Sequence, residues 1–220
     1  MVKLVINKKT YGDLIIFENT SIEIEKGAFV GIKGLSGSGK TTLINMIGFL
    51  EPFSGDYYIR GEVLNKKQYE TFRRKYVTYV FQTSKLIPYE TVINNIIMPL
   101  KNLKEPINYE EIYESAHSLG IYEILEKKAG LLSGGEQQRV AILRALATKR
   151  PIILADEPTG SLDFENKSIV MKLLSKINKD FNRTIIMVTH DNQLDSYFTH
   201  TFTIKEKVIV WLVTLLKFKT

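Results

Sequence analysis

The stretch "FVGIKGLSGSGKTTLINMIGFL", residues 29–50, decides the fold class. Its first five residues form an apolar run that is typical of a strand buried on both faces of a parallel sheet. The glycine-rich loop that follows leads into a stretch, 40–50, with the pattern of a helix. Glycines let a backbone wrap closely around phosphate oxygens, and a helix start offers free N–H groups and a favourable dipole. The stretch therefore predicts a phosphate-binding loop between a strand and a helix.

Two residues of this loop have side chains suited to a nucleoside triphosphate. Lys40 would neutralise the β and γ phosphates, and the Thr41 hydroxyl would ligate Mg²⁺. The only alternative is a chance glycine turn, which the flanking strand and helix argue against. The predicted nucleotide-binding residues here are Gly34, Leu35, Ser36, Gly37, Ser38, Gly39, Lys40, Thr41 and Thr42.

Outside this stretch, short apolar runs alternate with helical patterns. "IILA" (152–155) and "IIMV" (185–188) resemble further buried strands, and the apolar residues of 165–180 fall on one helix face. Such alternation predicts an α/β fold with a mostly parallel sheet. "LIIF" and "IEI", within residues 1–30, read as antiparallel strands flanking that sheet. Residues 84–148 carry helical signals, so we expect one domain, 1–220, with a core (1–83 and 149–220) and an inserted helical subdomain.

Two acids follow one of the predicted strands, in "IILADEP" (152–158). The tip of a parallel strand is where ligands bind in doubly wound sheets. Asp156 would hold Mg²⁺, directly or through water, and Glu157 would accept a proton from an attacking water. A solvated acidic turn is the alternative interpretation.

Three further polar features lie at predicted strand ends or just beyond them. Gln82 could touch Mg²⁺ or the attacking water, or it could be an ordinary exposed glutamine. His190 could hydrogen-bond the γ phosphate and orient water, or it could be a surface histidine. "SLD", residues 161–163, fits a helix N-cap, because Ser and Asp both cap well.

A second potential anion site is "LSGGEQQR", residues 132–139. Ser133 and Glu136 have the spacing of a capping box, and an apolar face follows them. A capped helix does not explain the two glycines or Gln137–Gln138–Arg139. A second anion-binding helix start is useful if it approaches a triphosphate from the other side, on the same chain or on a second copy. A two-fold dimer would bury two ATP molecules in this way.

Composition excludes several classes of function. The chain has 220 residues, 44% hydrophobic, without cysteine, so disulfides, Cys–zinc sites and thiol catalysis are excluded. Its net charge of +6 is spread along the chain without a basic tail, and we expect no nucleic-acid partner. The N-terminus lacks signal-peptide features. The apolar run Val208–Leu216 is too short to span a bilayer and could be an extra strand, a buried helix or an interfacial segment. We expect a cytosolic chain.

Taken together, these motifs resemble the nucleotide-binding subunit of an ABC transporter over roughly residues 1–205, and the most specific is LSGG. The resemblance implies an ATP-driven sandwich dimer. It implies that Tyr11 stacks on adenine, although an ordinary strand-edge tyrosine is the alternative. It places Asp163 at the dimer interface and Ser133, Gly134, Gly135 and Glu136 at the ATP of the opposite chain, with contacts to the γ phosphate from Ser133 and Gly135.

The finer resemblance is to the small ATPases of lipoprotein-releasing, macrolide and antimicrobial-peptide exporters, with bacteriocin exporters and a cell-division ATPase as close cousins. It implies a separate transmembrane permease subunit that docks near 83–89, ATP and Mg²⁺ as cofactors, and a location on the inner face of the cell membrane. The alternatives are an ATPase of the same fold in a non-transport role, such as cell division, DNA repair or ribosome function, and, less well matched, a P-loop kinase or GTPase. The glycine-free, apolar C-terminus departs from the family pattern.

Overall fold

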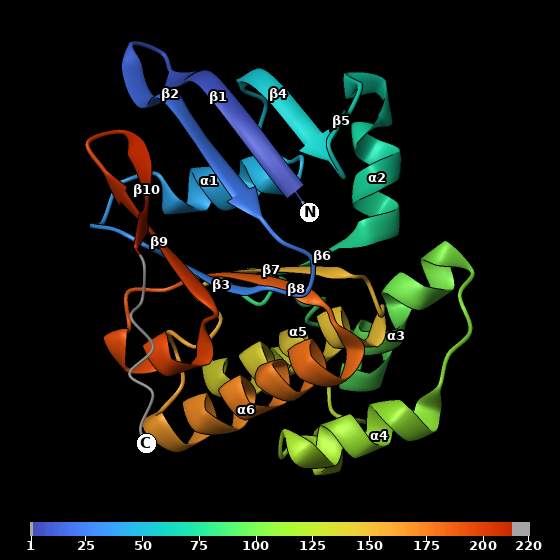
Figure 1. The fold of residues 1–220 in the computed structure, drawn as a ribbon. Helices are drawn as coiled ribbons and strands as arrows, with labels where there is room; N and C mark the ends of the chain where they lie inside the picture. The colour runs from blue at the N-terminus through green and yellow to red at the C-terminus, as the bar shows by residue number, and fades with distance from the viewer. Residues whose placement is uncertain (1, 213–220) are drawn as a thin grey trace.

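Two β-sheets, with a helix between them and helices beneath the larger sheet, make up the molecule (Figure 1). The structure is a computed structural model that describes residues 2–212. Among these residues, the smaller sheet is antiparallel, with strand order β2-β1-β4-β5. The larger sheet has the order β10-β9-β3-β8-β7-β6 and is parallel except for β10. The predicted α/β class, with an N-terminal antiparallel part, is confirmed.

The strands are β1 (Val2–Tyr11), β2 (Leu14–Ile24), β3 (Phe29–Lys33), β4 (Ser54–Ile59), β5 (Glu62–Val63), β6 (Val77–Val80), β7 (Ile152–Asp156), β8 (Thr184–Val188), β9 (His200–Lys205) and β10 (Val208–Leu212). The α-helices are α1 (Lys40–Ile47), α2 (Tyr69–Tyr76), α3 (Val92–Leu103), α4 (Tyr109–Ser118), α5 (Gly134–Ala147) and α6 (Phe164–Phe181). Short 3₁₀ turns lie at Lys66–Gln68, Tyr122–Ile124, Ala129–Leu131 and Asn192–Tyr197.

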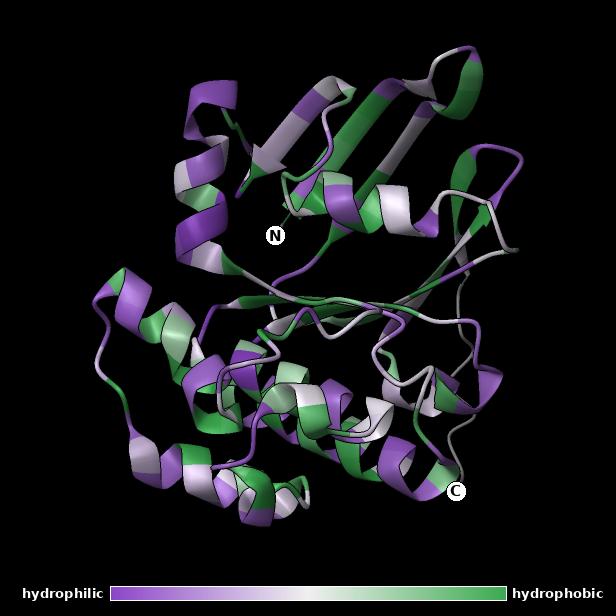
Figure 2. Cartoon of the chain, turned by 180° about the vertical axis from the view of Figure 1, so that it is seen from behind, coloured by the Kyte–Doolittle hydropathy of each residue, from purple (hydrophilic) through white to green (hydrophobic). Residues whose placement is uncertain are grey.

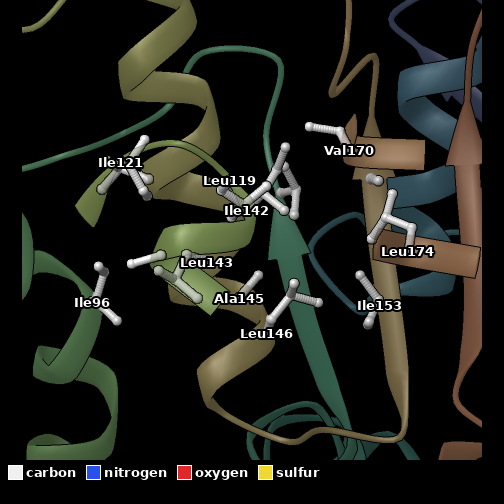
Figure 3. Close-up of a cluster of buried hydrophobic side chains, with 14 of the residues drawn as sticks. Ile96, Leu119, Ile121, Ile142, Leu143, Ala145, Leu146, Ile153, Val170 and Leu174 are labelled. Atoms are coloured by element: carbon white, nitrogen blue, oxygen red, sulfur yellow. The ribbon is translucent and has the colours of Figure 1, made fainter. Parts of the chain in front are cut away.

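Alternating residues of the central strands divide the interior into two cores. On β8, Ile185 and Met187 face the helices, whereas Ile186 and Val188 face the smaller sheet and α1. Figure 3 shows the first core, in which side chains of α3, α5 and α6 meet Ile153 of β7. Because both faces of these strands are covered, their sequences are continuously apolar. This burial fixes the carboxyl ends of β3, β6, β7 and β8 along one edge of the sheet.

Two predicted elements differ from the structure. "LIIF" and "IEI" lie in one strand, β2, which pairs with β1 along its length; they are not two separate strands. Between them Asn19 has a φ of 46°, but the strand continues past this irregularity, with Glu18 paired to Lys8 and Thr20 paired to Ile6. The helix expected over 40–50 ends at Ile47, because Phe49 adopts a left-handed φ of 61° through which a helix cannot continue. The half-buried Tyr79 leaves no room for a side chain at Gly48.

The region 84–148, expected to be an inserted helical subdomain, contains α3, α4 and all of α5, and α5 also packs against β6 of the larger sheet. The apolar C-terminal run continues the sheet as β10 over Val208–Leu212, antiparallel to β9. Its remainder, 213–216, lies outside the described residues. None of the helices in the described range 2–212 is both long and apolar enough for a membrane span.

Candidate functional site

The phosphate loop follows β3 and ends at Gly39, the N-cap residue of α1. Gly39 has φ 97°, in the left-handed region, and a Cβ there would overlap the side chains of Ile16 and Phe17. No side chain caps this helix start. The first N–H groups of α1 are therefore available to an anion.

Inside the loop, polar groups converge. Lys40 is only 9% exposed, and its Nζ donates to the carbonyl oxygens of Gly34 and Leu35, both at 2.9 Å. An ammonium group has three donors, so one is left for a further acceptor. Among the described residues, the buried hydroxyl of Ser38 has no hydrogen-bond partner. A phosphate group would accept hydrogen bonds from both the remaining Lys40 donor and the Ser38 hydroxyl.

Asp156, the last residue of β7, lies beside the start of α1. Its carboxylate accepts a hydrogen bond from the Thr41 side chain and lies near Lys40. Burial raises the pKa of Asp156 above its ordinary value, and the Thr41 hydrogen bond only partly offsets that rise. Carboxylate and hydroxyl oxygens are ligands that Mg²⁺ prefers when phosphate and water complete its shell. The pair Thr41–Asp156 therefore fits such an ion. The described residues contain no larger cluster of acids and histidines that could hold a metal.

Glu157 follows directly and contacts His190, which lies two residues beyond the end of the neighbouring strand β8. Its φ is 44°, an uncommon conformation for a non-glycine residue, and its N–H donates to Val188 O at 3.0 Å. This turn brings Glu157 Oε1 within 3.2 Å of His190 Nδ1. Because β7 and β8 pair in parallel, their tips set a carboxylate and an imidazole next to each other. Such a pair can accept a proton and orient a water.

Gln82 and Tyr11 lie in less defined surroundings. Gln82 is exposed two residues beyond β6, which pairs with β7, so it lies along the same edge of the sheet as Asp156. Tyr11 ends β1 and is 46% exposed. Lys9 Nζ lies 4.5 Å from the centroid of its ring, on which it packs as a cation. The adenine and Mg²⁺ contacts of these two residues stay predictions.

The LSGG turn forms the predicted capping box at the start of α5. Ser133 Oγ accepts from Glu136 N at 3.3 Å, and Ser133 N donates to Glu136 Oε2 at 2.8 Å. The hydrogen bonds from Ser133 hold the pKa of Glu136 below its ordinary value, so this carboxylate stays charged. Gly134 lies exposed at the first position of the helix.

A pocket of about 380 Å³ joins this turn to Asp163, which caps α6. Arg139 of α5 lines the pocket, and its Nη1 donates to Asn166 Oδ1 at 2.6 Å. Asn166 in turn donates to both carboxylate oxygens of Asp163, through its backbone N–H at 2.8 Å and its Nδ2 at 2.7 Å. The sequence motifs did not identify this role of Asn166. For Arg139 the only sequence signal was that a capped helix does not explain Gln137–Gln138–Arg139.

The same QQR helix also holds the segment that follows β6. Gln138 Nε2 donates to Phe81 O at 3.2 Å, and Ser84 Oγ donates to Gln137 Oε1 at 3.1 Å. Arg144 donates to the carbonyl oxygens of Ser84 and Lys85, each at 2.8 Å. The start of the segment 83–89 is therefore tied to the helix that begins with LSGG.

Comparisons with known proteins agree with this geometry. The family model described as ABC transporter matches residues 17–160. The chain belongs to the ABC transporter family. It is 39% identical over 191 residues to the lipoprotein-releasing system ATP-binding protein LolD of Francisella tularensis, covering 84% of this chain and 83% of that relative. It is 38% identical over 208 residues to the bacitracin export ATP-binding protein BceA of Halalkalibacterium halodurans, covering 90% and 82%.

The fold also matches a solved ABC transporter cassette. The dimeric structure of the bacterial ABC transporter cassette MJ0796 superposes with a TM-score of 0.84 at 35% identity, covering 95% of this chain and 96% of that one. A second structure of that cassette is a post-hydrolysis dimer bound to ADP and Pi, with a TM-score of 0.82. The present chain is thus an ATPase subunit of an ABC transporter.

Proposed function

We propose that two copies of this chain close on two MgATP molecules and, on hydrolysis, drive export or membrane extraction of a peptide or lipoprotein through a separate permease at the inner face of the membrane. The observation that carries the proposal is the Glu157–His190 contact beside Lys40, Thr41 and Asp156, at the carboxyl ends of adjacent strands. The exported class follows from the relatives named for lipoprotein release and bacitracin export.

Each side chain of the site has a distinct task. Lys40 and the start of α1 bind the phosphates, and Thr41 and Asp156 would hold Mg²⁺, which neutralises phosphate charge. Glu157 takes the proton of the attacking water, and His190 holds Glu157 and that water in position. Gln82 senses the γ phosphate from the segment that follows β6.

The LSGG turn of one copy completes the nucleotide site of the other copy. The pocket between Ser133 and Asp163 is lined by α5, its preceding turn and the start of α6, and its lining residues do not include the phosphate loop of the same chain. Ser133, Gly134, Gly135, Glu136 and Asp163 are therefore free to reach a nucleotide held by a second copy. ATP would favour the closed dimer because it binds that state more tightly.

Co-purification from membranes tests the transport part of this proposal. The Glu157→Gln chain, tagged in its native cells, is isolated after gentle solubilisation with MgATP. A stoichiometric multi-span membrane protein is the expected partner. If only soluble protein or nucleic acid co-purified, the ATPase chemistry would be unaffected, and a non-transport role would replace the proposed transport function.

Lys40→Ala tests the nucleotide site itself. Removing a charge-assisted contact of about 1.5–3 kcal/mol should weaken ATP binding roughly 10- to 100-fold, measured with a fluorescent ATP analogue. Lys66→Ala, an exposed lysine of a 3₁₀ turn, is the matched control and should bind normally. Unchanged affinity in Lys40→Ala would remove Lys40 from its role.

A further inference from the structure

Lys167 of α6 is a charged residue on a helix face that otherwise packs against the core. The buried residues of α6 include Val170, Met171 and Leu174. Residues three, four and seven positions apart share one face of a helix, so Lys167 lies on this inward face. Figure 2 shows that the helices beneath the larger sheet carry both hydrophobic and hydrophilic residues. A lysine on the inward face needs a polar partner.

That partner is Asp191, the residue after His190. Lys167 Nζ donates to Asp191 Oδ2 at 2.9 Å, and the two side chains are only 26% and 17% exposed. The start of α6 thus lies beside the turn that follows β8 (Figure 1). Because water reaches this ion pair only partly, salt screens it less than it screens a pair on the open surface. The pair therefore ties the turn to the helix.

Asp191 fixes the backbone of the turn that presents His190. Its N–H donates to Thr189 Oγ1 at 3.1 Å, and its Oδ1 accepts from Gln193 N at 3.0 Å. The side chain of His190 is 70% exposed and approaches Glu157 Oε1 at 3.2 Å. Since so little of the imidazole is packed, its position depends on the backbone that Asp191 anchors.

A second lysine holds the same turn further along the chain. Lys33, the last residue of β3, donates to Asn192 Oδ1 at 2.8 Å and forms an ion pair with Asp195. Lys33 thus acts on residues beyond Asp191, whereas Lys167 acts on the residue next to His190. Loss of Lys167 should therefore move the imidazole more than loss of Lys33.

The first turn of α6 is also tied to the pocket beside the LSGG turn. Asp163 caps α6, and its carbonyl oxygen accepts from Lys167 N at 2.9 Å. The carboxylate of Asp163 accepts from Asn166, which Arg139 of α5 contacts in turn. One helical turn thus connects the residue predicted to meet a second copy with the residue next to His190.

We propose that Lys167 is a positioning residue for ATP hydrolysis, which acts on His190 through Asp191. It holds the imidazole beside Glu157 and links it to the turn that Asp163 caps. The link rests on the proposed function, in which Asp163 meets the nucleotide of the other copy. Closure on that nucleotide fixes the first turn of α6, and the ion pair passes this constraint to the histidine of the same chain.

The histidine NMR signals of the nucleotide-free chain test the positioning without any hydrolysis. The chain has three histidines, so isotopically labelled histidine gives few signals, and His190→Ala identifies those of His190. Lys167→Met keeps an unbranched side chain, removes the charge and should shift the His190 signals. Lys172→Met, at an exposed lysine of the same helix, is the control and should leave them in place. Asp191→Ala removes the opposite charge, so a shift in the same direction reports movement of the ring.

Hydrolysis and ATP binding are measured on the same variants. Lys167→Met should lower kcat about ten-fold, while KM and the affinity for a fluorescent ATP analogue stay as in the parent. A displacement of about 1 Å can cost roughly a hundred-fold in rate, and the loss here is smaller because Gln193 N and Lys33 still hold the turn. Lys167→Arg should recover most of the rate because it keeps the charge and a donor. Lys172→Met should hydrolyse ATP as the parent does.

The order of events is tested in the Glu157→Gln background with MgATP. Adding Lys167→Met should leave the ATP-driven dimer intact in sedimentation velocity, because Lys167 acts on His190 after closure. The same variant with Glu157 in place should still hydrolyse slowly. A lower rate at an unchanged amount of dimer assigns the loss to the position of His190.

Three results would overturn the proposal: unmoved His190 signals in Lys167→Met, hydrolysis by that variant at the parent rate, or a loss of ATP affinity as large as the loss of rate. The last would assign Lys167 to the general folding of the site. A Glu157→Gln chain that stays monomeric with MgATP would instead refute the proposed dimer, and the shift of the His190 signals would be unaffected.

Discussion

Two tyrosines next to α1, each with a buried hydroxyl, should respond in opposite ways to replacement by phenylalanine. The Tyr79 hydroxyl is buried without a hydrogen-bond partner among the described residues, facing Gly48. The Tyr57 hydroxyl, also buried, donates to Ile47 O at 2.7 Å, the carbonyl at the end of α1. Burial raises the pKa of both phenols, so both are neutral near pH 7. The pair isolates the effect of one hydrogen bond.

The magnitudes follow from these surroundings. A buried hydroxyl without a partner costs about 1–3 kcal/mol, and removing its oxygen leaves a void that costs only ~0.3 kcal/mol. Tyr79→Phe should therefore raise the free energy of unfolding by about 1 kcal/mol. Tyr57→Phe removes one hydrogen bond and leaves a buried carbonyl without that donor. This should lower the free energy of unfolding by about 1–2 kcal/mol.

Urea unfolding followed by circular dichroism measures both variants against the parent. For a domain of this size, 1 kcal/mol shifts the melting temperature by about 2–4 °C, so thermal melts give a second readout. The reasoning is refuted if Tyr79→Phe destabilises the chain as much as Tyr57→Phe. Equal m-values in the three proteins serve as the control for a common denatured state.

Three further perturbations have defined outcomes. Gly39→Ala should cost roughly 1–3 kcal/mol of stability and impair ATP binding, since its φ of 97° and the crowded Cβ position both resist a side chain; a normal urea midpoint would contradict this. Asn166→Ala removes the acceptor of Arg139 and should weaken ATP-driven dimerisation about ten-fold while ATP affinity of the monomer is unchanged; equal loss of both would show a general folding defect. The hydrogen bond from Lys167 holds the pKa of Asp191 below its ordinary value of 3.8, so its contribution to stability is present above about pH 4 and is lost as the pH falls through the lower, folded value. Asp191→Asn should flatten the acid limb of a stability-versus-pH curve, and an unchanged limb would remove this ion pair from the account.

The sequence predicted the elements whose chemistry is local. A strand, a glycine loop and a helix follow one another between 29 and 47, and each is recognisable from its own residues. The capping box of Ser133 and Glu136 depends on two residues three apart, so it too was predictable.

Features that depend on distant partners were not predictable. Gly48, at the end of α1, lies against Tyr79, 31 residues further along the chain, and the continuous course of β2 is decided by its pairing with β1. Asn166 contacts Arg139 across 27 positions of sequence, and no periodicity or motif carries that information. The interpretation of Val208–Leu216 stayed open among three structures because an apolar run fits each of them; its pairing partner decides for a strand over Val208–Leu212.

The central claim is that ATP is bound between two copies of the chain and that Glu157 is the base that accepts the proton of the attacking water. Its most direct test is the oligomeric state of the Glu157→Gln variant in MgATP, measured by sedimentation velocity. The rate of phosphate release by the same variant is measured in parallel. The account predicts a stable ATP-dependent dimer with hydrolysis slowed about 10²- to 10⁴-fold, while Glu165→Gln, an exposed acid of α6, behaves as the parent. Hydrolysis at the parent rate, or a chain that stays monomeric with ATP bound, would contradict it.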